Sequence, residues 1–261
     1  ESPQSRKTNL FVILGALFLT NAILAEIIGV KIFSGEKTLG LDPVQWTFFG
    51  EFVLDFNLTA GAVIWPVVFI TTDLINEYFG KKGVKKISFL TAGLITYVFV
   101  IISLVTALAP ASFWLEVNAS MPDGSSFDIN YAFNTIFRQG LGIIIGSLTA
   151  FLLGQLIDVY VFQKLRAVTG PKMIWLRATG STLVSQFIDS FVVLGIAFYV
   201  FGNWSLPQIA AVGLINYVYK FTVAMALTPV LYLAHGLIDR YLGKELAEKM
   251  TEEATGDQSF L

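Results

Sequence analysis

Cysteine is absent from this chain of 261 residues, and histidine occurs only once, as His235. The absence of cysteine excludes disulfides and thiolate metal sites. A single histidine excludes a histidine-rich metal cluster. Charged residues are also scarce, at 14% of the chain, whereas an ordinary soluble domain has about 25%. We therefore predict neither a metal site nor a cofactor, and the low charge points away from a soluble protein.

Apolar residues make up 55% of the chain, and its mean hydropathy is +0.69. Six runs reach the length of about 20 residues that a helix needs to cross a bilayer. They cover approximately residues 10–32, 53–79, 87–110, 139–163, 174–201 and 207–235. No run alternates as a membrane strand does over about 10 residues. We predict an all-α polytopic membrane protein, with residues 1–261 forming a single transmembrane domain of six helices.

The positions of lysine and arginine predict the orientation of these helices. If the runs cross the membrane in turn, 13 of the 17 basic residues lie on the side of the termini, 3 on the other side and Lys220 within a run. Cytoplasmic segments carry the excess of positive charge. The sequence therefore predicts a multi-pass inner-membrane (plasma-membrane) protein with both termini in the cytoplasm. The long loop 111–138 would face outside, and residues 243–261 would form a polar cytoplasmic tail with a short surface helix.

Polar residues interrupt the apolar runs at helical spacing. The sharpest case is a repeated pattern, Gln155-Leu156-Ile157-Asp158 and Gln186-Phe187-Ile188-Asp189, in two consecutive runs. An ionised side chain at mid-depth costs about 2.5–3.5 kcal/mol on insertion scales. Several such groups therefore indicate a shared polar cavity.

The depth of each group follows from its distance to the centre of its run, at about 1.5 Å per residue. Asn21, Gln186, Asp189, Asn216 and Lys220 fall near mid-depth, and Asp73, Asn76, Glu77 and Asp158 fall about 10 Å toward the cytoplasm, with Gln155 less deep. Glu26 falls on the outer side of centre. Residues three or four apart share a helix face, so the members of each run form a stripe, as the wall of a cavity requires.

Other roles are open for several of these residues. Asn21 and Asn216 are compatible with ordinary hydrogen bonds between helices. Asp73 and Glu77 are compatible with a position near the cytoplasmic interface, where water and lysines stabilise their charge. Lys220 is compatible with a structural ion pair, and Arg177 is expected at the interface as an anchor.

Two further motifs stand out, Thr72-Asp73-Leu74-Ile75-Asn76-Glu77-Tyr78-Phe79-Gly80 and the segment RATGSTLVSQFIDS, residues 177–190. Together they resemble the queuosine-precursor transporter family, the YhhQ-like or VUT group. The resemblance extends over nearly the whole chain. It implies import of 7-cyano- and 7-aminomethyl-7-deazaguanine. It also implies a small nucleobase-like molecule and the lipid bilayer as partners, and no nucleic acid.

The polar residues fit such a substrate. A guanine-like edge presents two donors to one carboxylate, and its flat ring stacks on aromatic side chains. We predict a mid-membrane site at Gln186, Asp189 and Lys220, with an exit path along Asp73, Glu77 and Asp158. The full candidate set is Gln186, Asp189, Lys220, Asn216, Asn21, Asp73, Glu77, Gln155, Asp158 and Trp65.

Other functions remain as alternatives. The chain could be the substrate-binding subunit of a multi-part ATP-driven vitamin or base importer, in which a partner protein would bind ATP because no glycine-rich phosphate loop occurs here. An intramembrane aspartyl protease would use Asp158 and Asp189, but its Gly-x-Gly-Asp pattern is absent. We therefore predict no enzyme. Pro66 and Pro229 are candidate hinges. The coupling ion, a repeat between the halves and a homo-oligomer are left open.

Overall fold

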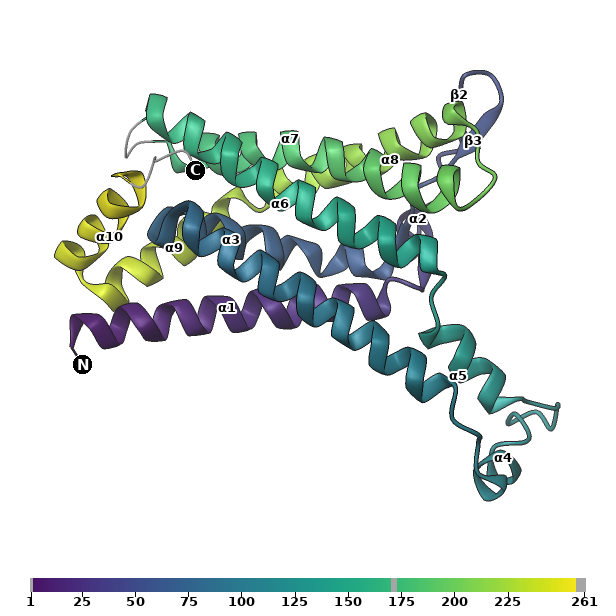
Figure 1. The fold of residues 1–261 in the computed structure, drawn as a ribbon. Helices are drawn as coiled ribbons and strands as arrows, with labels where there is room; N and C mark the ends of the chain where they lie inside the picture. Colours follow the sequence, from purple (N-terminus) through teal and green to yellow (C-terminus); the bar gives the residue numbers. More distant parts are fainter. Residues whose placement is uncertain (1, 170–172, 257–261) are drawn as a thin grey trace.

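The computed structural model describes residues 2–169 and 173–256, and most of these residues lie in helices (Figure 1). Helix α1 covers Pro3–Ile28, and Ser2 caps its N-terminus, since the Ser2 hydroxyl accepts a hydrogen bond from the Ser5 N–H at 3.2 Å. Five helical segments of the described chain are long and apolar enough to cross a membrane. They are Pro3–Ile28, Trp65–Thr106, Ile129–Thr169, Ile174–Val200 and Leu206–Ala226. The chain is thus a mostly helical, polytopic membrane protein.

Short strands follow α1, where the sequence predicts loop and helix. Strand β1 (Ile32–Ser34) pairs antiparallel with β4 (Asn57–Thr59), and β2 (Trp46–Phe48) pairs antiparallel with β3 (Phe52–Leu54). Helix α2 (Gly35–Thr38) and the 3-10 helix η1 (Ala60–Val63) complete this region. The prediction of helix from residue 53 is wrong, because strands β3 and β4 and the 3-10 helix η1 occupy most of the residues from 53 to 63.

Helix α3, Trp65–Thr106, consists of two legs joined at Gly80. The backbone of Gly80 has φ 64° and ψ −167°, a conformation that glycine adopts easily because it has no Cβ. Figure 1 shows the chain arriving at one end of the bundle, reversing, and leaving toward the other end. The two legs of α3 therefore correspond to residues 65–79 and 87–106 of the segments that the sequence places at 53–79 and 87–110.

The rest of the chain is a series of helices. They are α4 (Ser112–Val117), α5 (Ile129–Phe137), α6 (Leu141–Thr169), α7 (Ile174–Leu194), the π-helix η2 (Gly195–Val200), α8 (Leu206–Ala226), α9 (Thr228–Leu242) and α10 (Lys244–Gly256). Helices α4 and α5 belong to the loop 111–138 and extend away from the other helices (Figure 1).

Pro66 and Pro229, the two candidate hinges, lie at the starts of helices and not within them. Pro66 lies in the first turn of α3, and Pro229 lies in the first turn of α9. Proline fits there because N–H groups in the first turn form no hydrogen bond within the helix, so a residue without an N–H loses none. The run predicted at 207–235 is consequently divided at Leu227 into α8 and α9.

Helix α10 packs against the bundle and is not a loose tail. It buries Ala247, Met250 and Ala254. A Cβ on Gly80 would lie 3.1 Å from the backbone oxygen of Ala254, so the turn of α3 and the last helix approach closely. The surface helix expected in the tail 243–261 forms within its described residues, but it has a buried apolar face.

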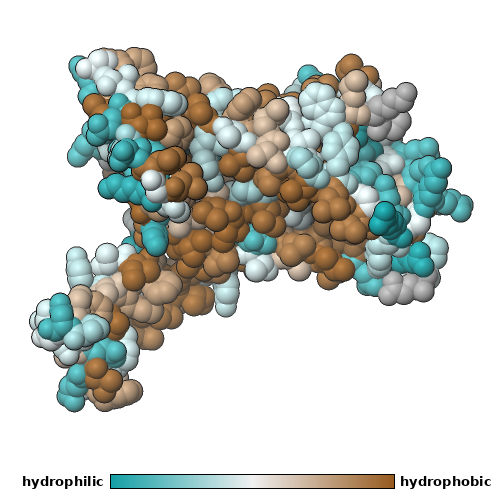
Figure 2. Space-filling model, turned by 180° about the vertical axis from the view of Figure 1, so that it is seen from behind, coloured by the Kyte–Doolittle hydropathy of each residue, from teal (hydrophilic) through white to brown (hydrophobic). Residues whose placement is uncertain are grey.

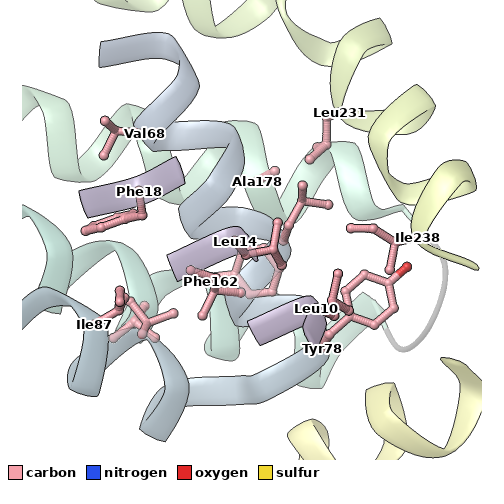
Figure 3. Packing of buried hydrophobic residues seen from close by; sticks show 14 of the residues in the cluster. Leu10, Leu14, Phe18, Val68, Tyr78, Ile87, Phe162, Ala178, Leu231 and Ile238 are labelled. Atoms are coloured by element: carbon pink, nitrogen blue, oxygen red, sulfur yellow. The ribbon is translucent and has the colours of Figure 1, made fainter. Parts of the chain in front are cut away.

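Apolar side chains occur both on the outer surface and in the buried core. Figure 2 shows apolar side chains across the middle of one face, with hydrophilic ones gathered toward its ends. Inside, Phe18, Val68 and Phe162 are fully buried and come from α1, α3 and α6 (Figure 3). The core therefore joins the first half of the chain to α6 and α7.

Small residues bring α6 and α7 together. Gly142, Gly146, Ala150 and Gly154 recur every fourth position and form one buried face of α6. A Cβ on Gly146 would lie 3.1 Å from the backbone oxygen of Val193. Small residues at this spacing let membrane helices pack backbone to backbone. This close contact positions the polar side chains of the two helices opposite one another.

Candidate functional site

A lysine and an aspartate form an ion pair between α7 and α8. The Nζ atom of Lys220 donates a hydrogen bond to Oδ2 of Asp189. The side chains are 19% and 21% exposed, respectively. Charges withdrawn from water in this way depend on each other, because removing one leaves the other uncompensated. The structure thus brings together two residues that the sequence places at mid-depth.

Two amide side chains lie one helical turn from this pair. Gln186 precedes Asp189 on α7 and is 7% exposed, so it faces the helix bundle and not lipid. Asn216 precedes Lys220 on α8 and is half-buried. Residues three or four apart share a face, so both amides extend the face that carries the ion pair.

A second carboxylate, Glu26, lies beside the ion pair. The hydroxyl of Ser147 on α6 lies 2.6 Å from each oxygen of the Glu26 carboxylate. Glu26 also interacts electrostatically with Asp189. The sequence places Glu26 on the outer side of centre, but the predicted candidate set does not include it. A carboxylate within an otherwise apolar run is the sequence feature that indicates such a residue. Glu26, Ser147, Asp189 and Lys220 are called the central layer below.

Another polar group lies on the side of the central layer that faces α10. Asp158 on α6 accepts a hydrogen bond from the Ser185 hydroxyl of α7 at 3.2 Å. Asp73 on α3 interacts electrostatically with Asp158. The Thr72 hydroxyl approaches Oε1 of Gln155 at 3.3 Å. All of these side chains are buried. Asp73, Gln155, Asp158 and Ser185 are called the inner layer below.

The two layers are one helical turn apart. A Cβ on Gly154 would lie 3.7 Å from the Cβ of Asp189, and Asp158 follows Gly154 by four residues on α6. Ser185 precedes Asp189 by four residues on α7. Four residues correspond to about 6 Å along a helix. The carboxylates of Asp158 and Asp189 are therefore stacked along one helix–helix interface.

A narrow pocket reaches the inner layer from the junction of α8 and α9. It has a volume of about 20 Å³, which is room for about one water molecule. Its lining is Phe69, Ile70, Asp73, Ala178, Thr179, Thr182, Ala224, Leu227, Thr228 and Leu231. Asp73 is the only carboxylate in this lining, so the pocket connects that side chain to the break between α8 and α9.

Glu77 lies in a buried ion cluster. One guanidinium nitrogen of Arg177 lies 2.9 Å from both oxygens of Glu77. Arg166 lies 3.6 Å from the same carboxylate and donates to the backbone oxygen of Thr251 in α10 at 2.6 Å. The side chain of Glu77 is 4% exposed. The expectation that Arg177 anchors the interface is wrong, because Arg177 is fully buried.

Other candidates form contacts of a different kind. The Asn21 side-chain amide donates to the backbone oxygen of Leu17 at 2.8 Å, so this bond is within one helix and not between helices. Trp65 stacks on Phe69 with ring centroids 6.0 Å apart, and it also contacts Phe151. Asn76, which shares a face with Asp73, accepts a hydrogen bond from Gln163 at 2.7 Å.

The sequence of the chain is similar to those of known proteins. The sequence model of a family described as "Putative vitamin uptake transporter" matches residues 59–234. A "Probable queuosine precursor transporter" of Bacillus subtilis (strain 168) is 32% identical over 188 residues, covering 70% of this chain and 75% of the relative.

The chain belongs to the queuosine precursor transporter family.

Two further relatives carry related names. A "Probable queuosine precursor transporter" of Haemophilus influenzae is 28% identical over 199 residues, covering 76% of this chain and 75% of the relative. The "Queuosine precursor transporter" of Escherichia coli (strain K12) is 28% identical over 206 residues, covering 76% and 80%. No solved structure matches the chain significantly.

Membership in the queuosine precursor transporter family confirms the prediction of a transporter and not an enzyme. The region that matches the family model contains Asp73, Asp158, Asp189 and Lys220, whereas Glu26 precedes it. The relatives' names give no support to a subunit of an ATP-driven importer.

Proposed function

We propose that the chain imports 7-cyano-7-deazaguanine and 7-aminomethyl-7-deazaguanine across the inner membrane, with the substrate bound at Asp189, Gln186 and Lys220. The ion pair of Asp189 and Lys220 is the observation that carries this proposal. It presents an acceptor and a donor within a membrane bundle, where ionisable residues commonly mark substrate pathways. The names of the three relatives support the substrate class.

The chemistry of the pair matches the hydrogen-bonding edge of a guanine-like base. The N1–H and the exocyclic amine both donate, and the Asp189 carboxylate accepts both. Oxygen O6 accepts, and the Lys220 ammonium or the Gln186 amide donates to it. The substrate would thereby replace part of the contact between Asp189 and Lys220, so that binding and separation of the pair occur together.

Transport would alternate access between the two ends of the bundle. The remaining candidates, Asn216, Asn21, Gln155 and Trp65, would line the path, and Asp73 and Asp158 would form its cytoplasmic part. Glu77 would hold the helices together through Arg177. The break between α8 and α9 at Leu227 adjoins the pocket at Asp73. At this break α9 would change its angle relative to α8.

We expect transport to be selective for the guanine-like edge. Proteoliposomes with the purified protein should take up radiolabelled 7-cyano-7-deazaguanine, and unlabelled 7-aminomethyl-7-deazaguanine should compete with it. Adenine should compete poorly, because its edge lacks the adjacent pair of donors and a buried acceptor would remain unpaired. Uptake no greater than in empty liposomes, or equal competition by adenine, would contradict the proposal.

The proposed orientation has six crossings, formed by α1, the two legs of α3, α6, α7 with η2, and α8 with α9. Both termini would be cytoplasmic. The loop lysines Lys81, Lys82, Lys85 and Lys86 lie at the turn of α3, at the bundle end that also holds the N-terminus (Figure 1). This clustering agrees with the positive-inside rule.

Single cysteines test this orientation without background, since the chain contains no cysteine. In intact cells, a membrane-impermeant maleimide should label Asp123→Cys in the outer loop. It should label Lys249→Cys in α10 only after the membrane is opened. Both side chains are exposed, so a lack of labelling would not result from burial. The reverse pattern would contradict cytoplasmic termini.

A further inference from the structure

Two inner-layer carboxylates lie close together without a positive partner. Asp73 and Asp158 are each 5% exposed and interact electrostatically. Among residues 2–169 and 173–256, no lysine or arginine forms an ion pair with either. Oxygen Oδ1 of Asp73 and oxygen Oδ2 of Asp158 are buried, and neither has a hydrogen-bond partner. An uncompensated pair of this kind is costly inside a bilayer.

The surroundings of the two carboxylates differ. Asp158 accepts a hydrogen bond from Ser185, and Ser181 and Thr182 place two more hydroxyls beside it. These donors stabilise a negative charge. Among the described residues, no side chain donates a hydrogen bond to the buried oxygen Oδ1 of Asp73, and Asp73 lines the narrow pocket between α3, α7 and the α8–α9 junction. A proton shared by the pair therefore belongs on Asp73.

The other charged groups nearby already have partners. The groups from the surrounding helices are Glu77 and Tyr78 of α3, Arg166 of α6, Arg177 of α7, Lys220 of α8, and His235 and Asp239 of α9. Glu77 pairs with both arginines, and Lys220 pairs with Asp189. Asp239 accepts from Tyr78 at 2.6 Å and lies 3.1 Å from His235. Within the described chain, neither inner-layer carboxylate thus has a positive partner, and Glu77 adds a further negative charge near Asp73.

We propose that Asp73, assisted by Asp158, is the binding site of a coupling proton. This inference rests on the proposed function and adds its driving ion. The Asp73 carboxylate takes up one proton from the outer side to form a neutral carboxylic acid. After the bundle opens inward, the acid releases the proton to cytoplasmic water and the carboxylate forms again. The pocket, with room for about one water molecule, adjoins the side chain that would hold the proton.

The test separates accumulation from exchange in proteoliposomes, with radiolabelled 7-cyano-7-deazaguanine as the probe. A proton gradient of about one pH unit, without sodium, should sustain about a tenfold accumulation when one proton accompanies each substrate molecule. The variant Asp73→Asn should lose this accumulation and its pH dependence. It should still exchange labelled for unlabelled substrate, because exchange needs no net proton movement.

Two variants control the comparison. Asp42→Asn removes an exposed carboxylate of the outer region and should accumulate substrate as the unmutated protein does. Asp73→Glu keeps a titratable carboxylate and should retain accumulation with a shifted pH profile. This variant, together with direct measurement of proton entry by an enclosed pH dye in the unmutated protein, keeps the proposal testable if Asp73→Asn does not fold.

Distinct outcomes identify which idea fails. Accumulation by Asp73→Asn with the pH dependence of the unmutated protein would overturn the proton site. Accumulation driven by a sodium gradient and not by a proton gradient would also overturn it. If the unmutated protein neither accumulates nor exchanges the probe, the proposed substrate is wrong, and the proton proposal falls with it. Exchange without proton-driven accumulation by the unmutated protein would leave the substrate intact and refute the coupling.

Discussion

Replacing Asp189 with asparagine should reduce uptake of 7-cyano-7-deazaguanine by at least about 100-fold, while the protein still folds. The carboxylate would accept two charge-assisted hydrogen bonds from the substrate, each contributing about 1.5 kcal/mol or more. Asparagine keeps one neutral acceptor oxygen, so the loss of charge assistance, of one hydrogen bond and the penalty of an unpaired buried donor together correspond to about 3 kcal/mol, or about 100-fold. Asparagine also places an NH₂ group opposite the two substrate donors, so one buried donor stays unpaired. The fall should appear in both exchange and accumulation.

The matched control is Asp123→Asn, the same substitution in the exposed outer loop. Asp123 accepts hydrogen bonds only from the backbone and hydroxyl of Ser125 at 3.0 and 2.6 Å in the described chain, so its loss should leave uptake unchanged. Uptake is measured in proteoliposomes with equal amounts of protein that elutes as a single species. Uptake by Asp189→Asn at the unmutated rate would refute the role of Asp189 in binding.

The variants Asp189→Asn and Asp73→Asn are expected to differ in their effects on transport. A substrate ligand is needed in every cycle, so its loss stops exchange as well as accumulation. A proton site is needed only when net movement is coupled, so its loss spares exchange. The central and inner layers are only one turn apart along α6 and α7, and the two assays are needed to assign them different roles.

The sequence could predict which positions carry polar side chains in the interior, because each interrupts an apolar run. It could not predict their partners. Asp73, Asn76 and Glu77 share one face of α3, as the spacing predicts. The structure nevertheless directs them to different neighbours, since Asp73 interacts with Asp158, Asn76 with Gln163 and Glu77 with Arg177. Such pairings depend on the rotation of helices that are distant in sequence.

The fold could be predicted in outline for a similar reason. Length and hydropathy locate helices such as α1 and α6, because burial in lipid needs only an apolar run of sufficient length. The reversal at Gly80 depends on one backbone conformation, and the pairing of β1 with β4 joins segments that are far apart in the chain. The sequence predicts Arg177 at the membrane interface as an anchor, whereas the side chain is fully buried. Its partner Glu77 precedes it by 100 residues, which the sequence does not show.

That partnership predicts a large loss of stability when Arg177 is replaced. In Arg177→Met the apolar side chain occupies similar space, but Glu77 loses its 2.9 Å contact and keeps only Arg166 at 3.6 Å. Breaking a buried pair by removing one partner costs about 3–5 kcal/mol, because the remaining charge is uncompensated. The free energy of unfolding, measured in mixed detergent micelles, should fall by that amount. Arg240→Met, at an exposed arginine in the last turn of α9, should change it by less than about 0.5 kcal/mol.

The double variant Glu77→Gln/Arg177→Met distinguishes the loss of a charge pair from the loss of packing. Removing both charges leaves no carboxylate to compensate, so the double variant should be more stable than Arg177→Met by about 1–2 kcal/mol. Arg166 then keeps its hydrogen bonds to the backbone oxygens of Glu77 and Thr251, which hold α10 against the turn of α3. If the double variant is less stable than Arg177→Met alone, the contribution of Arg177 comes from packing. Glu77 would then have a role that does not depend on this arginine.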